Sequence, residues 1–116
     1  MVMPQFKALV DEAKKQIEEV DADQLKRMQQ SGEKFSLIDV RDKEDADKGM
    51  IPGAVNISRG MLEYKIDQVT TDPDHNIVLY CGGGSRSALA AASLKKMGFK
   101  NVMSLSGGYK GWKEST

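Results

Sequence analysis

Short apolar runs alternate with longer amphipathic segments along this chain. Residues 35–40, 77–80 and 101–103 are brief apolar runs bounded by polar residues or glycine. Such runs are typical of buried strands, so we predict a strand at each of them. Residues 51–57 add a tight turn that leads into a short extended segment.

Helical periodicity fills most of the remaining sequence. Residues 5–19 place a narrow apolar stripe opposite a densely charged face, which indicates a helix on the outside of the domain; a partner-binding helix is the alternative. Asp21 or Asp23 can cap a second helix, which ends at Ser31-Gly32. Further helices are predicted at 41–48, 59–69, 86–97 and 109–114. We expect the helix at 86–97 to point Leu89, Leu94 and Met97 inward.

The alternation of strands and helices predicts an α/β domain. Strands joined through helices form a parallel sheet that is covered on both faces. Ligands of such sheets bind beyond the carboxyl ends of the strands. Cys81 follows one predicted strand, and Asp39 lies near the end of another. We therefore place the candidate site at this edge of the sheet.

Charge and composition exclude several classes of protein. Lys+Arg and Asp+Glu balance at 17 each, which leaves no basic field for nucleic acid or an anionic membrane. No apolar run approaches the ~18 residues of a membrane span, and residues 1–10 lack the features of a secretory signal. The single cysteine excludes an internal disulfide and disfavours a thiolate metal cluster. We expect a cytoplasmic protein with no nucleic-acid or membrane partner, no metal and no cofactor.

Cys81 and the loop after it carry the candidate chemistry. Cys81 closes a strand and is followed by Gly82, Gly83 and Gly84. An inert buried thiol is the alternative, but three glycines are entropically costly, and their N–H groups can converge on one anion. The start of a helix and the Arg86 charge would lower the thiol pKa from its usual value of about 8.5.

A nucleophilic thiol in an anion cradle suits two reactions. One is transfer of a sulfane sulfur through a cysteine persulfide, and the other is phosphate or arsenate ester chemistry. Four residues separate Cys81 from Arg86, one fewer than in cysteine-dependent phosphatases, so the ring fits a terminal sulfur better. The general acid that a phosphatase needs has only unplaced candidates: Asp67, Asp72 and Asp74.

Five segments in fixed order resemble the rhodanese family of sulfurtransferases. They cover a strand motif, a proline-glycine turn, the cysteine loop, a closing strand and a glycine-tryptophan segment. These are residues 37–41, 49–57, 77–87, 97–102 and 105–112. The resemblance implies a rhodanese-like three-layer fold with a central, mostly parallel five-stranded sheet. It also implies a domain at 20–116 behind a helical extension at 1–19.

The resemblance implies a role for each residue of the cysteine loop. Cys81 matches the nucleophile that becomes a persulfide, and Arg86 matches the loop arginine. The cradle that binds the sulfur substrate consists of Gly82, Gly83, Gly84, Ser85 and Ser87. A donor such as thiosulfate, polysulfide or a protein persulfide would load Cys81, and cyanide, a small thiol or a protein acceptor would unload it.

This sequence departs from the family pattern at several positions. Met50 replaces a mainly structural histidine, and Ala46 replaces a common aromatic residue. Gly82 and Gly83 stand where many members carry larger or charged side chains, so this loop has a single arginine. It should attract dianionic thiosulfate less strongly, which favours polysulfide or a protein persulfide as the donor.

Three other residues are candidates near the site. We expect Asp39 and Arg41 to pair and anchor loops rather than to exchange protons. Arg59 could bind a donor anion at the mouth, or pair with Glu63 four residues later.

Four functions remain open from the sequence. A sulfurtransferase leads, and a persulfide carrier or redox partner-binding module with little turnover on small donors is the second. An arsenate or phosphate-ester enzyme and a catalytically silent scaffold are disfavoured.

Overall fold

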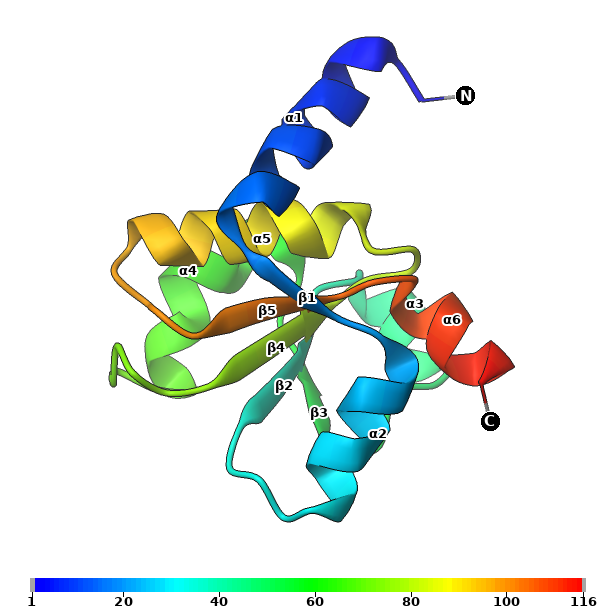
Figure 1. Ribbon diagram of the computed structural model, residues 1–116, viewed down its shortest axis with the longest axis vertical. Coiled ribbons are helices and arrows are strands. Elements are labelled where there is room, and N and C mark those ends of the chain that lie inside the picture. The colour runs from blue at the N-terminus through cyan, green and yellow to red at the C-terminus, as the bar shows by residue number, and fades with distance from the viewer. Residues whose placement is uncertain (1, 116) are drawn as a thin grey trace.

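The computed structural model describes residues 2–115, which form a parallel five-stranded sheet with helices on both faces (Figure 1). The strand order is β1-β5-β4-β2-β3, and every neighbouring pair is parallel. This confirms the α/β class. The strands are β1 Glu18–Val20, β2 Ser36–Asp39, β3 Ala54–Asn56, β4 Ile77–Tyr80 and β5 Val102–Leu105.

The helices follow the predicted order along the chain. They are α1 Pro4–Gln16, α2 Ala22–Gln30, α3 Lys43–Asp47, α4 Leu62–Lys65, α5 Ser85–Lys96 and α6 Gly108–Glu114. Asp21, one of the two caps that the sequence allowed, caps α2, and it does so in a capping box with Gln24 that was not predicted. The helix predicted at 59–69 is instead α4 flanked by two 3₁₀ turns, η1 Arg59–Met61 and η2 Ile66–Gln68.

Alternating side chains of β4 serve two separate cores. Ile77, Leu79 and Cys81 pack with residues of α4, η2 and α5 on one face. Val78 and Tyr80 pack on the other face, against residues of α2 and α6. Strand β4 lies between β5 and β2, and helices cover the sheet on both sides. Both faces of β4 are therefore buried, as expected for the centre of a parallel sheet.

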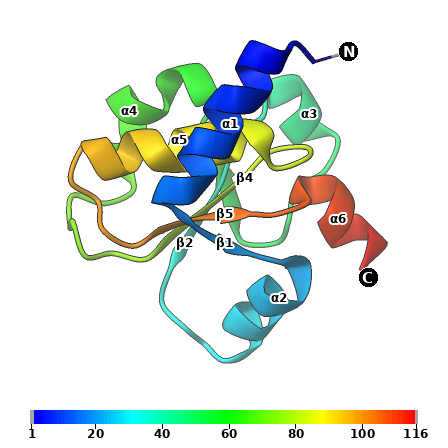
Figure 2. The ribbon, with the colours of Figure 1, turned by 45° about the horizontal axis from the view of Figure 1, so that its top comes forward.

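Helix α1 lies outside α5 and adds a layer to that side of the molecule (Figure 2). Its buried Val10 and Ala13 pack on Ala88 and Ala92 of α5. This agrees with the prediction of a helix packed outside the domain. The alanine side chains are small, so two helix backbones can approach closely there.

The end of the first helix was predicted wrongly. The helix ends at Gln16, and Glu18–Val20 forms strand β1, which pairs with β5. The helical period of the apolar residues continues to Ile17, and only a partner far along the chain favours the strand. The proposed boundary between residues 19 and 20 therefore falls within β1. The division into an extension 1–19 and a domain 20–116 stays a prediction, and its outer ends, residues 1 and 116, lie outside the described residues.

One helix-face assignment was also wrong. Met97 was expected to point inward but is 49% exposed. It is the C-terminal cap of α5, where the chain already turns away towards Gly98.

Candidate active site

Cys81 lies at the carboxyl end of the central strand. It follows Tyr80 directly, and its residue exposure is 2%. The strand alternation directs it to the α5 side of the sheet, where α5 begins four residues later at Ser85. The fold therefore places the thiol against the N-terminal end of a 12-residue helix.

Backbone N–H groups converge on the Cys81 sulfur. The N–H of Gly84 donates to Sγ at 3.1 Å and that of Ser87 at 3.4 Å, while Ser87 Oγ lies 3.6 Å from Sγ. Burial raises the pKa of the Cys81 thiol, but the Ser87 hydroxyl and the N–H groups of Ser87, Gly84 and Gly83 outweigh it, so the pKa is lowered overall. The loop thus stabilises a negative charge on sulfur.

The three loop glycines differ in what they contribute. Gly84 has φ +104°, and a Cβ there would lie 3.3 Å from the N atom of Gly107. A Cβ at Gly82 or Gly83 would meet nothing within 4 Å. Only Gly84 is therefore required by the backbone, whereas Gly82 and Gly83 leave the loop free of side chains.

The start of α6 forms the support under the cysteine loop. Tyr109 N–H donates to the Cys81 carbonyl at 2.8 Å, and Lys110 N–H donates to the Gly82 carbonyl at 3.2 Å. A Cβ at Gly108 would lie 2.6 Å from the carbonyl oxygens of both Cys81 and Gly82. Gly107 and Gly108 were expected only as part of the glycine-tryptophan segment at 105–112, and this contact was missed. A glycine pair separated from an apolar strand by one serine was the available signal.

Arg86 and Ser85 lie near the thiol in sequence but do not contact it. Arg86 is exposed, and within residues 2–115 its side chain has no hydrogen-bond or ion-pair partner. Ser85 is half-buried and lines a cavity of about 390 Å³ together with Phe6, Lys7 and Val10 of α1. Of the predicted loop residues, the structure therefore brings Gly84 and Ser87 onto the sulfur, while Arg86 faces solvent.

Asp39 and Arg41 form a buried pair after β2. The Asp39 carboxylate, 0% exposed, accepts hydrogen bonds from Arg41 Nη2 at 2.7 Å, from Nε at 3.1 Å and from the backbone N–H at 2.9 Å. Arg41 Nη2 also donates to the Gly49 carbonyl at 2.7 Å. The hydrogen bond to Asp39 raises the pKa of Arg41 further. The pairing expected from the sequence is present, and it ties the loop at Gly49 to β2.

An aromatic stack continues from this pair. The Arg41 guanidinium lies 4.3 Å from the Tyr109 ring centroid, and Tyr109 stacks on Trp112. The Tyr80 hydroxyl accepts a hydrogen bond from the Ile51 N–H at 3.1 Å, and burial raises the pKa of Tyr80. The stack connects α6, which supports the cysteine loop, with the Asp39–Arg41 pair.

Arg59 is engaged with α4 and α5. Its Nη1 donates to Glu63 at 2.8 Å, and Glu63 also accepts a hydrogen bond from Ser93 at 2.6 Å. Burial raises the pKa of Glu63, but the hydrogen bonds from Ser93 and Arg59 outweigh it and lower the pKa overall. The pairing with Glu63, which was the alternative to anion binding, is therefore present.

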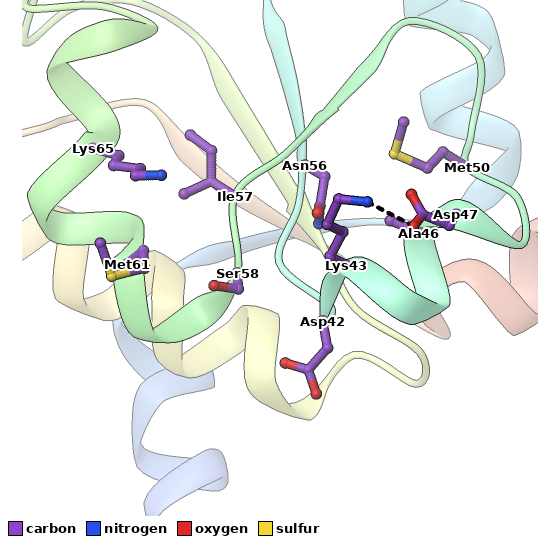
Figure 3. Close-up of a pocket in the computed structure, with 10 residues that line it drawn as sticks. All are labelled: Asp42, Lys43, Ala46, Asp47, Met50, Asn56, Ile57, Ser58, Met61 and Lys65. Atoms are coloured by element: carbon purple, nitrogen blue, oxygen red, sulfur yellow. Dashed lines mark hydrogen bonds and ion pairs between the residues drawn. The ribbon is translucent and has the colours of Figure 1, made fainter.

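A larger cavity of about 520 Å³ lies beyond the ends of β2 and β3 (Figure 3). Asp42 and Lys43 line it on the α3 side, and Ser58 and Lys65 line it on the opposite side. Lys43 pairs with Asp47 at 2.8 Å. Cys81 and its loop are not part of the lining. The cavity shares the carboxyl edge of the sheet with Cys81 but lies beyond the next two strands in the strand order, β2 and β3.

Between residues 2 and 115, no group of three or more His, Cys, Asp or Glu side chains is arranged to hold a metal ion. Over the same residues, no helix is long and apolar enough to cross a membrane.

A parallel α/β sheet with one thiol held by N–H donors at its carboxyl edge defines a class of cysteine-centred domains. Within that class, the model of the Rhodanese-like domain matches residues 21–115. The chain therefore belongs to the rhodanese-like domain family. The match leaves both α1 and β1 outside it.

Individual relatives agree with this assignment. The putative sulfurtransferase YtwF of Bacillus subtilis is 37% identical over 87% of this chain and 95% of its own length. The putative sulfur carrier protein YrkF of the same organism is 33% identical over 86% of this chain, which spans only 53% of that protein.

A solved structure from Rhodopseudomonas palustris matches nearly the whole chain. It is described as a protein of unknown function and possible tyrosine phosphatase. It is 35% identical with a TM-score of 0.86, and the match covers 99% of this chain and 93% of that one. The match therefore includes α1, which the family model leaves out.

Proposed function

We propose that this protein is a sulfurtransferase that carries a sulfane sulfur on Cys81. The observation that supports it most is the convergence of the Gly84 and Ser87 N–H groups on Sγ, at 3.1 and 3.4 Å. Donors fixed in advance stabilise charge where it develops, without reorganisation during the reaction. A relative named as a putative sulfurtransferase, which this chain covers almost completely, supports the same reaction class.

The reaction consists of two displacements at sulfur. The Cys81 thiolate attacks the sulfane sulfur of the donor, so a new S–S bond forms and the donor's own bond to that sulfur breaks. With thiosulfate the leaving group is sulfite. An acceptor nucleophile then attacks the outer sulfur of the Cys81 persulfide, and Cys81 leaves as thiolate. Cyanide gives thiocyanate, and a thiol gives a new persulfide.

The proposed roles follow from the contacts of each residue. Cys81 is the nucleophile, and Gly84 and Ser87 hold the charge on its sulfur. Gly82 and Gly83 leave the approach to the sulfur free of side chains, and a Cβ at either position would meet nothing within 4 Å. Arg86, exposed and without a partner within residues 2–115, is available to attract an anionic donor from solvent. A single arginine in the loop favours polysulfide or a protein persulfide over thiosulfate.

Steady-state transfer tests the proposal. The wild-type protein should convert cyanide to thiocyanate with polysulfide as the donor, and faster than with thiosulfate at equal concentration. Cys81→Ser should remove the activity with both donors. Wild-type turnover no faster than that of Cys81→Ser, with every donor and acceptor tried, would contradict catalytic transfer.

A persulfide carrier is the second candidate. The 33% identical relative that is named as a putative sulfur carrier favours it. A carrier would load sulfur on Cys81 rapidly but turn over small acceptors slowly. Comparing the loading rate with the turnover rate on the same preparation separates the two: slow turnover after rapid loading favours the carrier.

Phosphate-ester hydrolysis is the third candidate, because one similar structure is described as a possible tyrosine phosphatase. The ring between Cys81 and Arg86 is one residue shorter than in cysteine-dependent phosphatases. We expect no hydrolysis of a generic aryl phosphate, and Cys81-dependent hydrolysis would overturn that expectation.

A further inference from the structure

Two buried serines connect the Cys81 sulfur to the interior of β5. Ser87 and Ser104 are both 0% exposed, and their Oγ atoms lie 2.7 Å apart. Ser87 Oγ also lies 3.6 Å from Cys81 Sγ. A hydroxyl inside an apolar sheet is costly unless it is hydrogen-bonded, so the position of Ser104 calls for an explanation.

We propose that Ser104 is a positioning residue for sulfur transfer. It fixes the Ser87 hydroxyl so that this hydroxyl donates to Cys81 Sγ whenever the sulfur is negatively charged. The inference rests on the proposed function, because the charged sulfur is the nucleophile of the first displacement and the leaving group of the second. The sequence reasoning placed Ser87 in the cradle but gave Ser104 no role.

Proton counting explains why two serines are needed. The Ser87 hydroxyl carries one proton and can donate one hydrogen bond, either to Ser104 Oγ or to Cys81 Sγ. Beside a neutral thiol, the S–H group donates to Ser87, and Ser87 donates to Ser104. Beside a thiolate, Sγ can only accept, so Ser87 turns its proton to sulfur and Ser104 donates to Ser87. Two hydroxyl rotations achieve this change, and no proton leaves the pair.

The pair acts most directly when the persulfide is discharged. The acceptor thiolate attacks the outer sulfur, its new S–S bond forms, and the S–S bond to Cys81 breaks. The electron pair of the broken bond returns to Sγ, which becomes a thiolate. A Ser87 hydroxyl that is itself hydrogen-bonded by Ser104 is a stronger donor to that charge than an isolated one, because linked hydrogen bonds polarise one another.

The surroundings of Sγ leave this role to hydroxyl and N–H groups. The core around Cys81 is apolar and includes Ile38, Val40 and Leu62. The ionisable groups on the neighbouring elements are paired with each other or exposed to solvent. Asp39 pairs with Arg41, and Arg59 pairs with Glu63. Arg86 and Lys110 are exposed. The groups that lower the pKa of Cys81 are Ser87, Gly84 and Gly83.

The pH dependence of thiol alkylation tests the coupling between the serines. Ser104→Ala should raise the apparent thiol pKa by about 0.5 unit, and Ser87→Ala by about 1 unit. Because Ser104 acts through Ser87, adding Ser104→Ala to Ser87→Ala should shift the pKa no further. An equal shift in both backgrounds, or no shift in either, would overturn the inference.

A matched pair of variants separates the hydroxyl from the packing. Thr and Val have the same shape, so Ser104→Thr and Ser104→Val strain the strand equally and differ only in the hydroxyl. The thiol pKa of Ser104→Thr should stay at the wild-type value, whereas that of Ser104→Val should be raised. Ser104→Thr should also discharge a preloaded persulfide about threefold faster than Ser104→Val does. Identical behaviour of the two variants contradicts the proposal.

Failure of the proposed function can be distinguished from failure of the inference about Ser104. If wild-type Cys81 forms no persulfide, sulfur transfer is wrong, whereas the alkylation profiles still report whether the serine pair holds the thiolate.

Discussion

Two polar clusters lie at the carboxyl edge of the sheet, after the neighbouring strands β2 and β4, and they are built in opposite ways. In the first, Asp39 and Arg41 satisfy each other through several hydrogen bonds and are both buried. In the second, N–H donors from Gly84 and Ser87 meet on one sulfur that carries no formal charge as a thiol. The charges of the first cluster are already balanced, whereas the hydrogen bonds of the second become stronger when a negative charge forms on the sulfur.

The comparison shows which feature of a polar cluster points to chemistry. A buried ion pair at a strand end holds loops in place, here the segment at Gly49. A set of donors that converges on a nucleophile can stabilise charge that develops during a reaction. Changes in the first cluster should therefore affect mainly stability, and changes in the second mainly sulfur chemistry.

Removing the buried cation should have the largest effect on stability. Arg41→Met leaves the Asp39 carboxylate buried without its cation, with only the backbone N–H of residue 41 still donating to it, and we expect a loss of about 3–5 kcal/mol in the free energy of unfolding. Lys43→Met is the matched control, because its pair with Asp47 has side chains 81% and 61% exposed. It should change stability by less than about 1 kcal/mol. Urea denaturation of both variants gives the comparison, and equal stabilities would refute it.

Displacing the support of the cysteine loop should have the largest effect on sulfur loading in a folded protein. The Cβ of Gly108→Ala would lie 2.6 Å from backbone atoms of Cys81 and Gly82, so the loop must shift. A shift of about 1 Å at a reacting group can reduce a rate about 100-fold. Gly60→Ala is the control, because its Cβ meets nothing within 4 Å and Gly60 lies outside the cysteine loop. Loading kinetics followed by mass spectrometry should show a large loss for Gly108→Ala alone.

The pH dependence of the thiol should reflect its cradle. The folded pKa is lowered, so thiolate is present above that pKa and is lost as the pH falls through it. Alkylation of Cys81 by iodoacetamide should therefore reach half its maximal rate below pH ~8.5, the midpoint of a free cysteine. Ser87→Ala removes one donor and should move the midpoint upward. A wild-type midpoint at or above that of free cysteine would show that burial, not the cradle, dominates.

Arg59 should show the smallest effect. Because its guanidinium already pairs with Glu63, Arg59→Met should change the rate of loading by thiosulfate less than about twofold and stability by less than about 1 kcal/mol. Loading measured against thiosulfate concentration provides the test. A several-fold rise in the half-saturating concentration would instead support the role of Arg59 as a donor-binding residue at the mouth.

Local patterns were sufficient to predict most of the fold. The apolar runs at β2, β4 and β5 and the N-cap at Asp21 or Asp23 are short-range features, and the structure contains the three strands and a cap at Asp21. Strand β1 escaped prediction because a helical period of apolar residues runs up to Ile17, directly before it. Its three residues are held by β5, more than eighty residues along the chain. Pairing over such a distance leaves no local mark.

The same distinction applies to the candidate site. Cys81, Gly84 and Ser87 are close in sequence, so the glycine-rich loop and its resemblance to the rhodanese family were enough to select them. Gly108 and Ser104 join it from the end of the chain, through a backbone contact and a hydrogen bond that require the folded sheet. Their residue types are ordinary in a turn and a strand, so the sequence alone offered little reason to select them.

The most direct test of the central claim is the intact mass of the wild-type protein after incubation with a sulfur donor. The account predicts an added mass of one sulfur atom, located on Cys81 by peptide analysis, removed by cyanide and absent in Cys81→Ser. Wild-type protein that acquires no cyanide-labile sulfur on Cys81 from thiosulfate, polysulfide or a protein persulfide would contradict it.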